Sequence, residues 1–165
     1  MVIRPVADGE RDILAWLWQL FRHDLALYVD GRPYADGRYQ HAALASLSSP
    51  DVAAYLAWLP HPKTSEEAPV GFALIDGLTG AARSVRGFWT APALRRQGVG
   101  QELAVTALGR RPGPWRIGFQ HENVAAGIFW RKVATAAFGP DRWREVRQPV
   151  RSLPEVPADH VIESL

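Results

Sequence analysis

The stretch LRRQGVGQEL (94–103) constrains the fold most, because it joins two differently patterned segments through a pair of glycines. Before it, SVRGFWTAP (84–92) has the composition of a strand that ends at a proline. After it, apolar residues recur at helical spacing to about residue 110. A helix start presents unpaired amides, and glycine lets a ligand approach the backbone. The junction therefore predicts an anion site, most typically for phosphate.

Two common phosphate motifs do not fit this stretch. A P-loop requires a lysine directly after its last glycine, and Gln101 stands there. A dinucleotide fingerprint requires a third small residue three positions after Gly100, where this chain has Leu103. A plain turn with exposed arginines and an anion site of another kind both stay open at this point.

Composition indicates one globular domain. The chain has 165 residues, of which 47% are hydrophobic and 22% charged. It has no cysteine, which excludes disulfides, thiolate metal sites and a cysteine nucleophile. Its five histidines are far apart in the sequence, so we expect no metal. Seven tryptophans predict a tightly packed core or an aromatic-lined cleft.

Charge and hydropathy exclude several classes of protein. The N-terminal residues lack the apolar core of a signal peptide, and no apolar run is long enough to span a membrane. We therefore expect a cytoplasmic protein. The formal net charge is only +2 and the arginines are scattered, which argues against nucleic-acid binding.

Hydrophobic periodicity and turn residues predict a mixed α/β order within a single domain, 1–165. Ile13, Leu17, Leu20 and Phe21 mark the core face of the first helix, with Asp8 as its cap. The expected elements are strand 2–7, helix 10–29, loop 30–40, strands 53–59, 69–77 and 84–92 with a hairpin loop at TSEEA, helix 98–110, strand 114–121, a helix from an Asn123 cap to Gly139, and strands 143–150 and 159–165.

Two blocks of this chain resemble the GNAT N-acetyltransferase superfamily. Arg95, Gly98 and Gly100 match the pattern [QR]-x-x-G-x-[GA] at its strand-to-helix turn. The second block is an Asn, an Ala three residues on and an aromatic pair; here these are Asn123, Ala126, Phe129 and Trp130. FWRKV within that helix is also similar to a little-characterised group of predicted bacterial GNAT proteins. The detailed resemblance covers about residues 84–138.

The resemblance implies the GNAT fold, an α/β domain with a central, mostly antiparallel, splayed sheet flanked by helices. It also implies acetyl-CoA as co-substrate and no metal. Amides near 97–101 would bind the pyrophosphate, and the pantetheine arm would lie along strand 88–90, entering between it and strand 114–121. The implied acetyl-CoA site consists of Phe88, Trp89, Thr90, Arg95, Arg96, Gln97, Gly98, Val99, Gly100, Gln101, Asn123, Ala126, Phe129 and Trp130.

The implied reaction is direct attack of a primary amine on the acetyl thioester, and here the chain departs from the family. Many members have a tyrosine at the position of Trp130, which protonates the leaving thiolate, and a carboxylate on the strand before the glycines. SVRGFWT has no acid. The remaining candidate catalytic residues are His121 and Glu122 at the end of RIGFQHE (116–122), and Asp24 and Tyr28 late in the first helix.

Several alternatives stay open. A catalytically degenerate domain that binds acetyl-CoA as a sensor or partner module fits the missing tyrosine and carboxylate. An arginine-rich nucleic-acid- or ribosome-associated protein is a second alternative. The acceptor is a small molecule or a peptide, and loop 30–40 frames its pocket without selecting between them. The family often forms dimers, so a homodimer is also consistent with the sequence.

Overall fold

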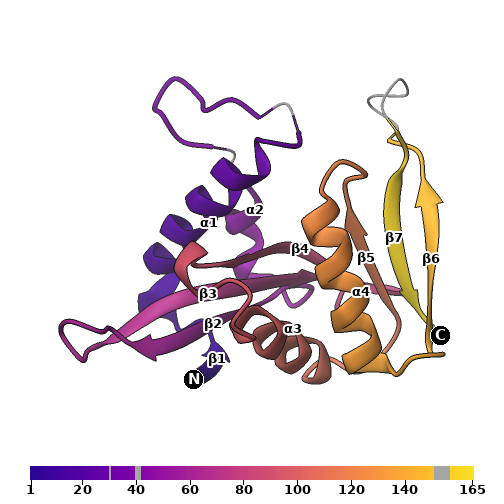
Figure 1. The fold of residues 1–165 in the computed structure, drawn as a ribbon. Coiled ribbons are helices and arrows are strands. Elements are labelled where there is room, and N and C mark those ends of the chain that lie inside the picture. The colour runs from indigo at the N-terminus through magenta and orange to yellow at the C-terminus, as the bar shows by residue number, and fades with distance from the viewer. Residues whose placement is uncertain (30, 40–41, 151–156) are drawn as a thin grey trace.

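The residues described by the computed structural model, 1–29, 31–39, 42–150 and 157–165, form a seven-stranded sheet with helices on both faces (Figure 1). No helix among these residues is both long and apolar enough to cross a membrane. The strands lie in the order β1-β2-β3-β4-β5-β7-β6. The elements are β1 Val2–Pro5, α1 Arg11–Leu25, α2 Ala42–Ala45, β2 Ala53–Pro60, β3 Glu67–Asp76, β4 Arg83–Thr90, α3 Val99–Gly109, β5 Trp115–Phe119, α4 Val124–Phe138, β6 Trp143–Gln148 and β7 Asp159–Ser164.

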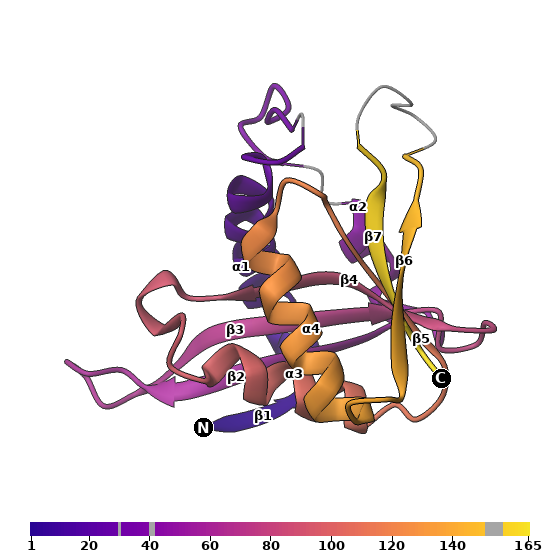
Figure 2. The same ribbon diagram turned by 45° about the vertical axis from the view of Figure 1, so that its right-hand side comes forward.

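The sheet is antiparallel except between β4 and β5, which the α3 crossover joins as a parallel pair. These two strands pair only where Arg83 meets Trp115 and Ser84 meets Arg116. Beyond that point they diverge, as Figure 2 shows. The mostly antiparallel, splayed sheet implied by the family resemblance is therefore confirmed.

Strand alternation divides the core between the two faces of the sheet, because successive side chains point to opposite sides. Helix α1 covers one face, where Leu14 and Trp18 pack against Phe72. Helices α3 and α4 cover the other face, where Leu103 and Val133 belong to one buried cluster. Five of the seven tryptophans are buried in these two clusters, which confirms a tightly packed core: Trp18, Trp58, Trp89, Trp115 and Trp130.

The first helix differs from its prediction in three ways. It ends at Leu25, so Tyr28 lies in the turn that follows. Asp8 does not cap it; this residue lies in a preceding 3-10 turn and its carboxylate accepts from Arg11. Leu20 is 44% exposed, whereas Leu14 and Trp18 are buried. The predicted face was wrong at Leu20 because several apolar sets fit helical spacing, and only packing on the sheet selects one.

The other boundaries shift by a few residues. Strand β3 starts at Glu67, inside the predicted hairpin loop, and β6 ends at Gln148. Strand β5 ends at Phe119, so His121 lies in a turn and not on a strand. Positions 30 and 40 of the predicted loop lie outside the described residues.

Gly87 tests how tightly α1 packs on β4. A Cβ at this position would lie 2.6 Å from Cζ3 of Trp18 and 3.2 Å from Cε2 of Phe72. We expect Gly87→Ala to lower the free energy of unfolding by about 1–3 kcal/mol, measured by urea denaturation. Gly118→Ala is the matched strand control, since its Cβ would meet only the His160 carbonyl at 3.9 Å. Equal stability of the two variants would contradict the packing described here.

Candidate active site

A tight turn connects β4 to α3. After Thr90 the chain forms one 3-10 turn, Pro92–Leu94, and then reverses through two residues with left-handed backbone angles. Arg96 has a φ of +63° and Gly98 a φ of +88°. Glycine adopts such a conformation without strain, whereas a residue with a Cβ does so at a cost of about 1–3 kcal/mol. The predicted glycine turn is therefore present, and it places Gly98 at the N-cap of α3.

The start of α3 has the geometry that an anion requires. The amide of Glu102 donates to the Gly98 carbonyl at 2.9 Å and begins the helical ladder. The amides of the turn before it, Val99–Gln101, therefore point out of the helix end. A Cβ on Gly98 would meet no atom within 4 Å, so the space in front of this turn is open. The residues present thus fit a pyrophosphate group.

Arg95 and Asp24 form an ion pair with each other. Nη2 of Arg95 pairs with the Asp24 carboxylate on α1, and its Nε donates to the Thr90 carbonyl at 3.2 Å. The Trp89 indole also donates to Asp24, at 3.1 Å. The charge of Arg95 is therefore directed toward α1, and Asp24 already accepts two hydrogen bonds. Gln97 holds the turn by donating to the Ala93 carbonyl at 2.7 Å.

The splay leaves most of one edge of β4 unpaired with β5. From Val85 to Thr90 no register partner on β5 exists among the described residues. Phe88 on this stretch packs against Phe129 and Trp130 of α4, with ring centroids 5.2 Å apart in both pairs. The Trp89 side chain points to the opposite face, against α1. The free backbone edge thus runs beside an aromatic cluster that Trp130 joins as a buried packing residue.

Asn123 caps α4 as predicted. Its Oδ1 accepts from the amide of Ala126 at 3.0 Å. A cap of this kind stabilises the helix by roughly 1 kcal/mol. Because the carbonyl oxygen is used, only the amide Nδ2 is left to donate to a ligand.

The four catalytic candidates divide into two separate pairs. Asp24 and Tyr28 lie at the end of α1, and Tyr28 is exposed there. His121 and Glu122 are exposed in the turn that links β5 to α4. No hydrogen bond between these two pairs occurs among the described residues. The structure thus does not assemble them into one catalytic group.

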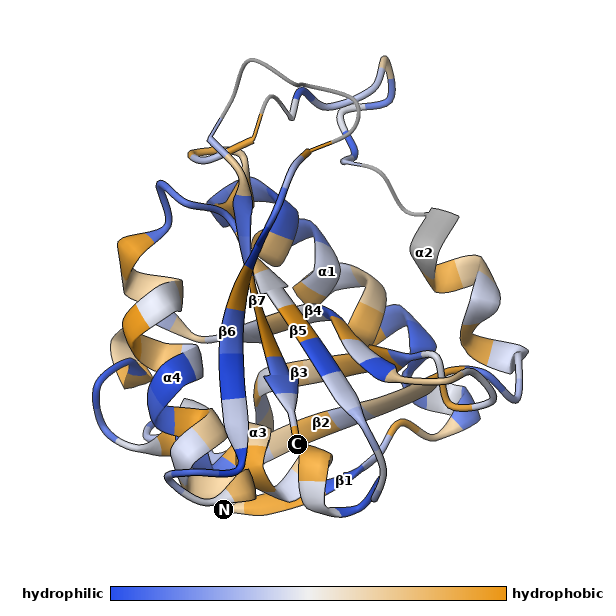
Figure 3. Ribbon diagram, turned by 90° about the vertical axis from the view of Figure 1, so that its right-hand side faces the viewer, coloured by the Kyte–Doolittle hydropathy of each residue, from blue (hydrophilic) through white to orange (hydrophobic). Residues whose placement is uncertain are grey.

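His121 has partners that the sequence did not reveal. His160 on β7 lies 3.0 Å from it, between Nε2 of His160 and Nδ1 of His121. Glu145 and Arg147 on β6 and Arg131 on α4 complete a polar cluster. Figure 3 shows that most of β6 is hydrophilic, with one hydrophobic stretch in its upper part. The only sequence signal for this cluster is the alternation of side chains along strand 143–150. It puts Glu145 and Arg147 on one face of the strand, but it does not identify the residues that they contact.

Arginine contact dominates the electrostatics of this cluster. Arg131 donates to Glu145 from Nε at 2.7 Å and from Nη2 at 2.8 Å. These bonds, aided by His160 and opposed by burial, lower the pKa of Glu145 to about 2. Burial and the nearby Glu122 charge raise the pKa of Asp159. Glu145 is therefore a fixed negative charge at neutral pH.

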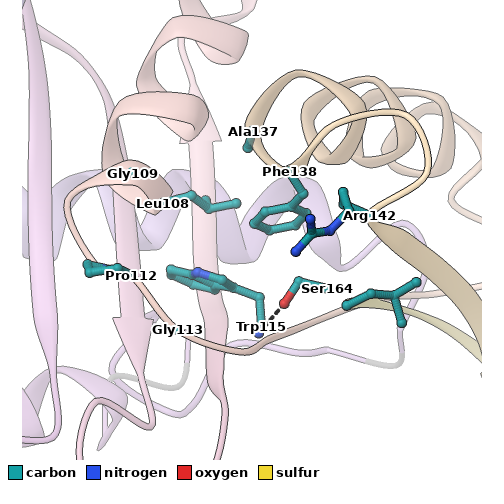
Figure 4. Close-up of a pocket in the computed structure, with 10 residues that line it drawn as sticks. Leu108, Gly109, Pro112, Gly113, Trp115, Ala137, Phe138, Arg142 and Ser164 are labelled. Atoms are coloured by element: carbon teal, nitrogen blue, oxygen red, sulfur yellow. Dashed lines mark hydrogen bonds between the residues drawn. The ribbon is translucent and has the colours of Figure 1, made fainter.

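A pocket at the opposite end of α3 is distinct from the glycine turn. Figure 4 shows it among Leu108, Trp115, Phe138 and Arg142, with Ser164 accepting from the Trp115 amide at 2.9 Å. Within the described ranges, no three His, Asp or Glu side chains gather as metal ligands would. The expectation of a metal-free protein stays a prediction.

Solved structures share this architecture, although no protein-family model and no curated protein sequence matches the chain. A variant of the spermidine N-acetyltransferase from Vibrio cholerae superposes with a TM-score of 0.65 at 9% identity, over 100% of this chain and 95% of that one. The chain has the GNAT fold. A GNAT-family acetyltransferase from Staphylococcus aureus gives a TM-score of 0.61 at 11% identity, over 99% and 98% of the two chains. The ribosomal-protein-alanine N-acetyltransferase from Brucella melitensis gives a TM-score of 0.63 at 13% identity, over 100% of this chain and 99% of that one.

If an anion binds at the start of α3, we expect Asp24 to compete with it for Arg95, and this competition can be measured. The pair is solvent-exposed, at 46% for Arg95 and 38% for Asp24, so it contributes little stability. We expect Asp24→Asn to tighten acetyl-CoA binding about two- to fivefold in calorimetry, because it frees a cation beside the anion site. Asp12→Asn on the same helix is the control and should change nothing. A tenfold loss of affinity would show instead that Arg95 must be held by Asp24.

Proposed function

We propose that this protein is a cytoplasmic N-acetyltransferase that moves the acetyl group of acetyl-CoA to a primary amine of a small molecule or peptide. One observation carries the proposal: β4 parts from β5 after Ser84, and its unpaired edge leads to the turn whose amides point out of α3. A free strand edge beside an anion site suits a ligand with an amide-bearing arm and a pyrophosphate. Acetyl-CoA is such a ligand.

Each part of the site has a role in this proposal. The amides of Val99–Gln101 bind the pyrophosphate, and the two glycines leave room for it. The pantetheine arm adds to the edge of β4 at Phe88–Thr90, and Asn123 donates to it from Nδ2. Arg96 and, after release from Asp24, Arg95 add positive charge. Phe129 and Trp130 pack beside the arm without reacting.

The bound thioester reacts by direct attack. A deprotonated amine attacks the carbonyl carbon, and an amide of β4 near Phe88–Thr90 stabilises the oxyanion. The C–N bond forms, the C–S bond breaks, and the thiolate takes up a proton. The GNAT-fold neighbours named as acting on spermidine and on a ribosomal-protein alanine both imply amine acceptors, which supports this reaction class.

A sensor or partner module that binds acetyl-CoA without transfer is the second candidate. Two observations favour it: Trp130 is buried where many relatives have tyrosine, and Asp24 is occupied by Arg95. Calorimetry with acetyl-CoA, followed by thiol release over a panel of polyamines, amino acids and peptides, separates the two. Turnover supports the enzyme, binding without turnover supports the module, and absence of binding overturns both.

Gly100→Glu tests the anion site. A glutamate in the first turn of α3 suits the helix dipole, and its Cβ would lie 3.4 Å from both Phe129 and Thr90, so we expect the fold to be retained while the added carboxylate repels the nearby pyrophosphate. We expect acetyl-CoA to bind at least about tenfold more weakly in calorimetry, or roughly 1.4 kcal/mol. Gly109→Glu at the far end of the same helix is the control, since a Cβ there meets no atom within 4 Å. Unchanged affinity in a folded Gly100 variant would refute the phosphate assignment.

Trp130→Phe tests whether transfer needs a general acid. A thiolate whose conjugate acid has a pKa near ~8.5 leaves near neutral pH without one. We expect the rate of the wild type to rise with pH through a single ionisation, without a falling limb below about pH 9. The variant should lose less than about tenfold in kcat, because Trp130 acts only through packing. Loss of a general acid would typically cost about 10²–10⁴-fold. A bell-shaped profile would reveal an acid near Trp130.

A further inference from the structure

The pocket between the C-terminal ends of α3 and α4 has no role in the proposed function. Helix α3 has 11 residues, so roughly 16 Å of helix separates this pocket from the glycine turn. Its volume is about 280 Å³, and its apolar wall consists of Leu108, Trp115, Ala137 and Phe138 (Figure 4). Ligand pockets begin at roughly 300 Å³, so this one suits a small molecule of about ten non-hydrogen atoms.

Trp115 gives the pocket a rigid floor. Its side chain is only 2% exposed, and its backbone is fixed from both neighbouring strands. On one side it is the register partner of Arg83 on β4. On the other side its amide donates to Oγ of Ser164 on β7 at 2.9 Å. The pocket is therefore formed by packed structure, and a ligand does not have to order it on binding.

Arg142 places an unpaired cation at this pocket. Its guanidinium has no hydrogen-bond or ion-pair partner within the described ranges, although its backbone is held twice. The Arg142 amide donates to the Gly139 carbonyl at 3.3 Å, and its carbonyl accepts from the Leu165 amide at 2.8 Å. Figure 4 shows the guanidinium turned toward Phe138 and Ser164. The fold thus holds this residue in place without using its charge.

Ser164 adds a second donor beside Arg142. Its Oγ already accepts from the Trp115 amide, so the hydroxyl hydrogen is left to donate. No acceptor for that hydrogen occurs in the described part of the chain. A guanidinium and a hydroxyl that both donate call for a group that only accepts. An ionised carboxylate is such a group, and its planar shape matches the guanidinium fork.

The charges around the pocket are predominantly positive. Arg110 and Arg111 directly follow α3 and donate to a backbone carbonyl and to a tyrosine hydroxyl. Arg83 fills the space that a Cβ on Gly113 would need, and its buried Nε has no partner among the described residues. With Arg142 these make four arginines, none in a salt bridge with a described carboxylate. The two helix C-termini contribute only about half a negative charge each, so the arginines outweigh them.

We propose that this pocket binds a small organic acid, a molecule with one carboxylate on an aromatic or aliphatic body. The body packs against Leu108, Trp115 and Phe138, and the carboxylate accepts from Arg142 and from the Ser164 hydroxyl. Binding makes or breaks no covalent bond. This inference goes beyond the proposed function and does not depend on it, because the glycine turn lies at the other end of α3.

NMR titration of the ¹⁵N-labelled full chain with 3-phenylpropionate, indole-3-acetate and hexanoate tests the site. We expect at least one of these acids to shift the assigned Trp115 indole signal saturably, with a Kd of about 0.1–1 mM for a ligand of this size. Phenethylamine has an ammonium in place of the carboxylate, and propionate lacks the ring. Both should bind at least about tenfold more weakly than 3-phenylpropionate.

Two outcomes of these titrations overturn the proposal. One is the absence of a saturable shift of the Trp115 signal with any of the three acids up to about 10 mM. The other is binding of phenethylamine as tight as that of 3-phenylpropionate, which would show that the carboxylate is not recognised.

Substitutions locate the carboxylate and the body of the ligand separately. Arg142→Gln should weaken the tightest acid at least about tenfold, because it removes a hydrogen bond between charged groups. Arg144→Gln is the matched control: it loses the same charge two residues away, where the guanidinium pairs with Glu163. Ala137→Phe leaves the charge unchanged and should block binding by filling the pocket. Affinity that is unchanged in either pocket variant, once circular dichroism shows it to be folded, overturns the proposal.

The outcome of these experiments is independent of acetyl transfer, because the titrations contain neither acetyl-CoA nor an amine acceptor. Repeating them with saturating acetyl-CoA should change the Kd of the acid by less than about twofold, since α3 separates the two sites. Displacement of the acid by acetyl-CoA would place it in the proposed acetyl-CoA site and overturn a separate pocket. A chain that binds the acid but no acetyl-CoA would refute the proposed function alone.

Discussion

The early parting of β4 and β5 is the constraint on which the rest of this structure depends. Two paired residues hold the strands together, and from there β3 keeps β4 on one side while β7 keeps β5 on the other. The inner edges of both strands are left with backbone donors and acceptors that need partners. A sheet interior that is open in this way is costly unless a ligand or water completes it, which is why we locate function there.

Two polar networks stand on either side of this opening, and each joins elements far apart in the sequence. On the α1 side, Asp24 connects the helix to Trp89 of β4 and to Arg95 of the glycine turn. On the β5 side, strand register brings Glu145 and His160 to His121. The first network connects α1 to the glycine turn, which is the anion site of the proposed function. The second places His121 and His160 beside Arg147, with the half-buried Glu145 carboxylate next to His160.

The departures from the family pattern are physically coherent. Trp130 is part of an aromatic cluster with Phe88 and Phe129, so its place is fixed by packing and not by proton transfer. A thiolate needs little help to leave, whereas an ammonium must lose a proton before it attacks. The absence of the family's tyrosine is therefore compatible with the proposed acetyl transfer.

The sequence by itself determined the order of elements, the glycine turn and the Asn123 cap, because each depends on local backbone preferences that neighbouring residues express directly. It also indicated the buried faces of α3, where Leu103 and Ala107 are both buried. It did not select the buried face of α1 correctly at Leu20, because helical spacing leaves the phase open until the helix packs on a sheet. Only the tertiary structure decided that Arg95 meets Asp24 and that His121 meets His160. Those pairs are 71 and 39 residues apart, and they arise from strand register and helix placement, which no local pattern encodes.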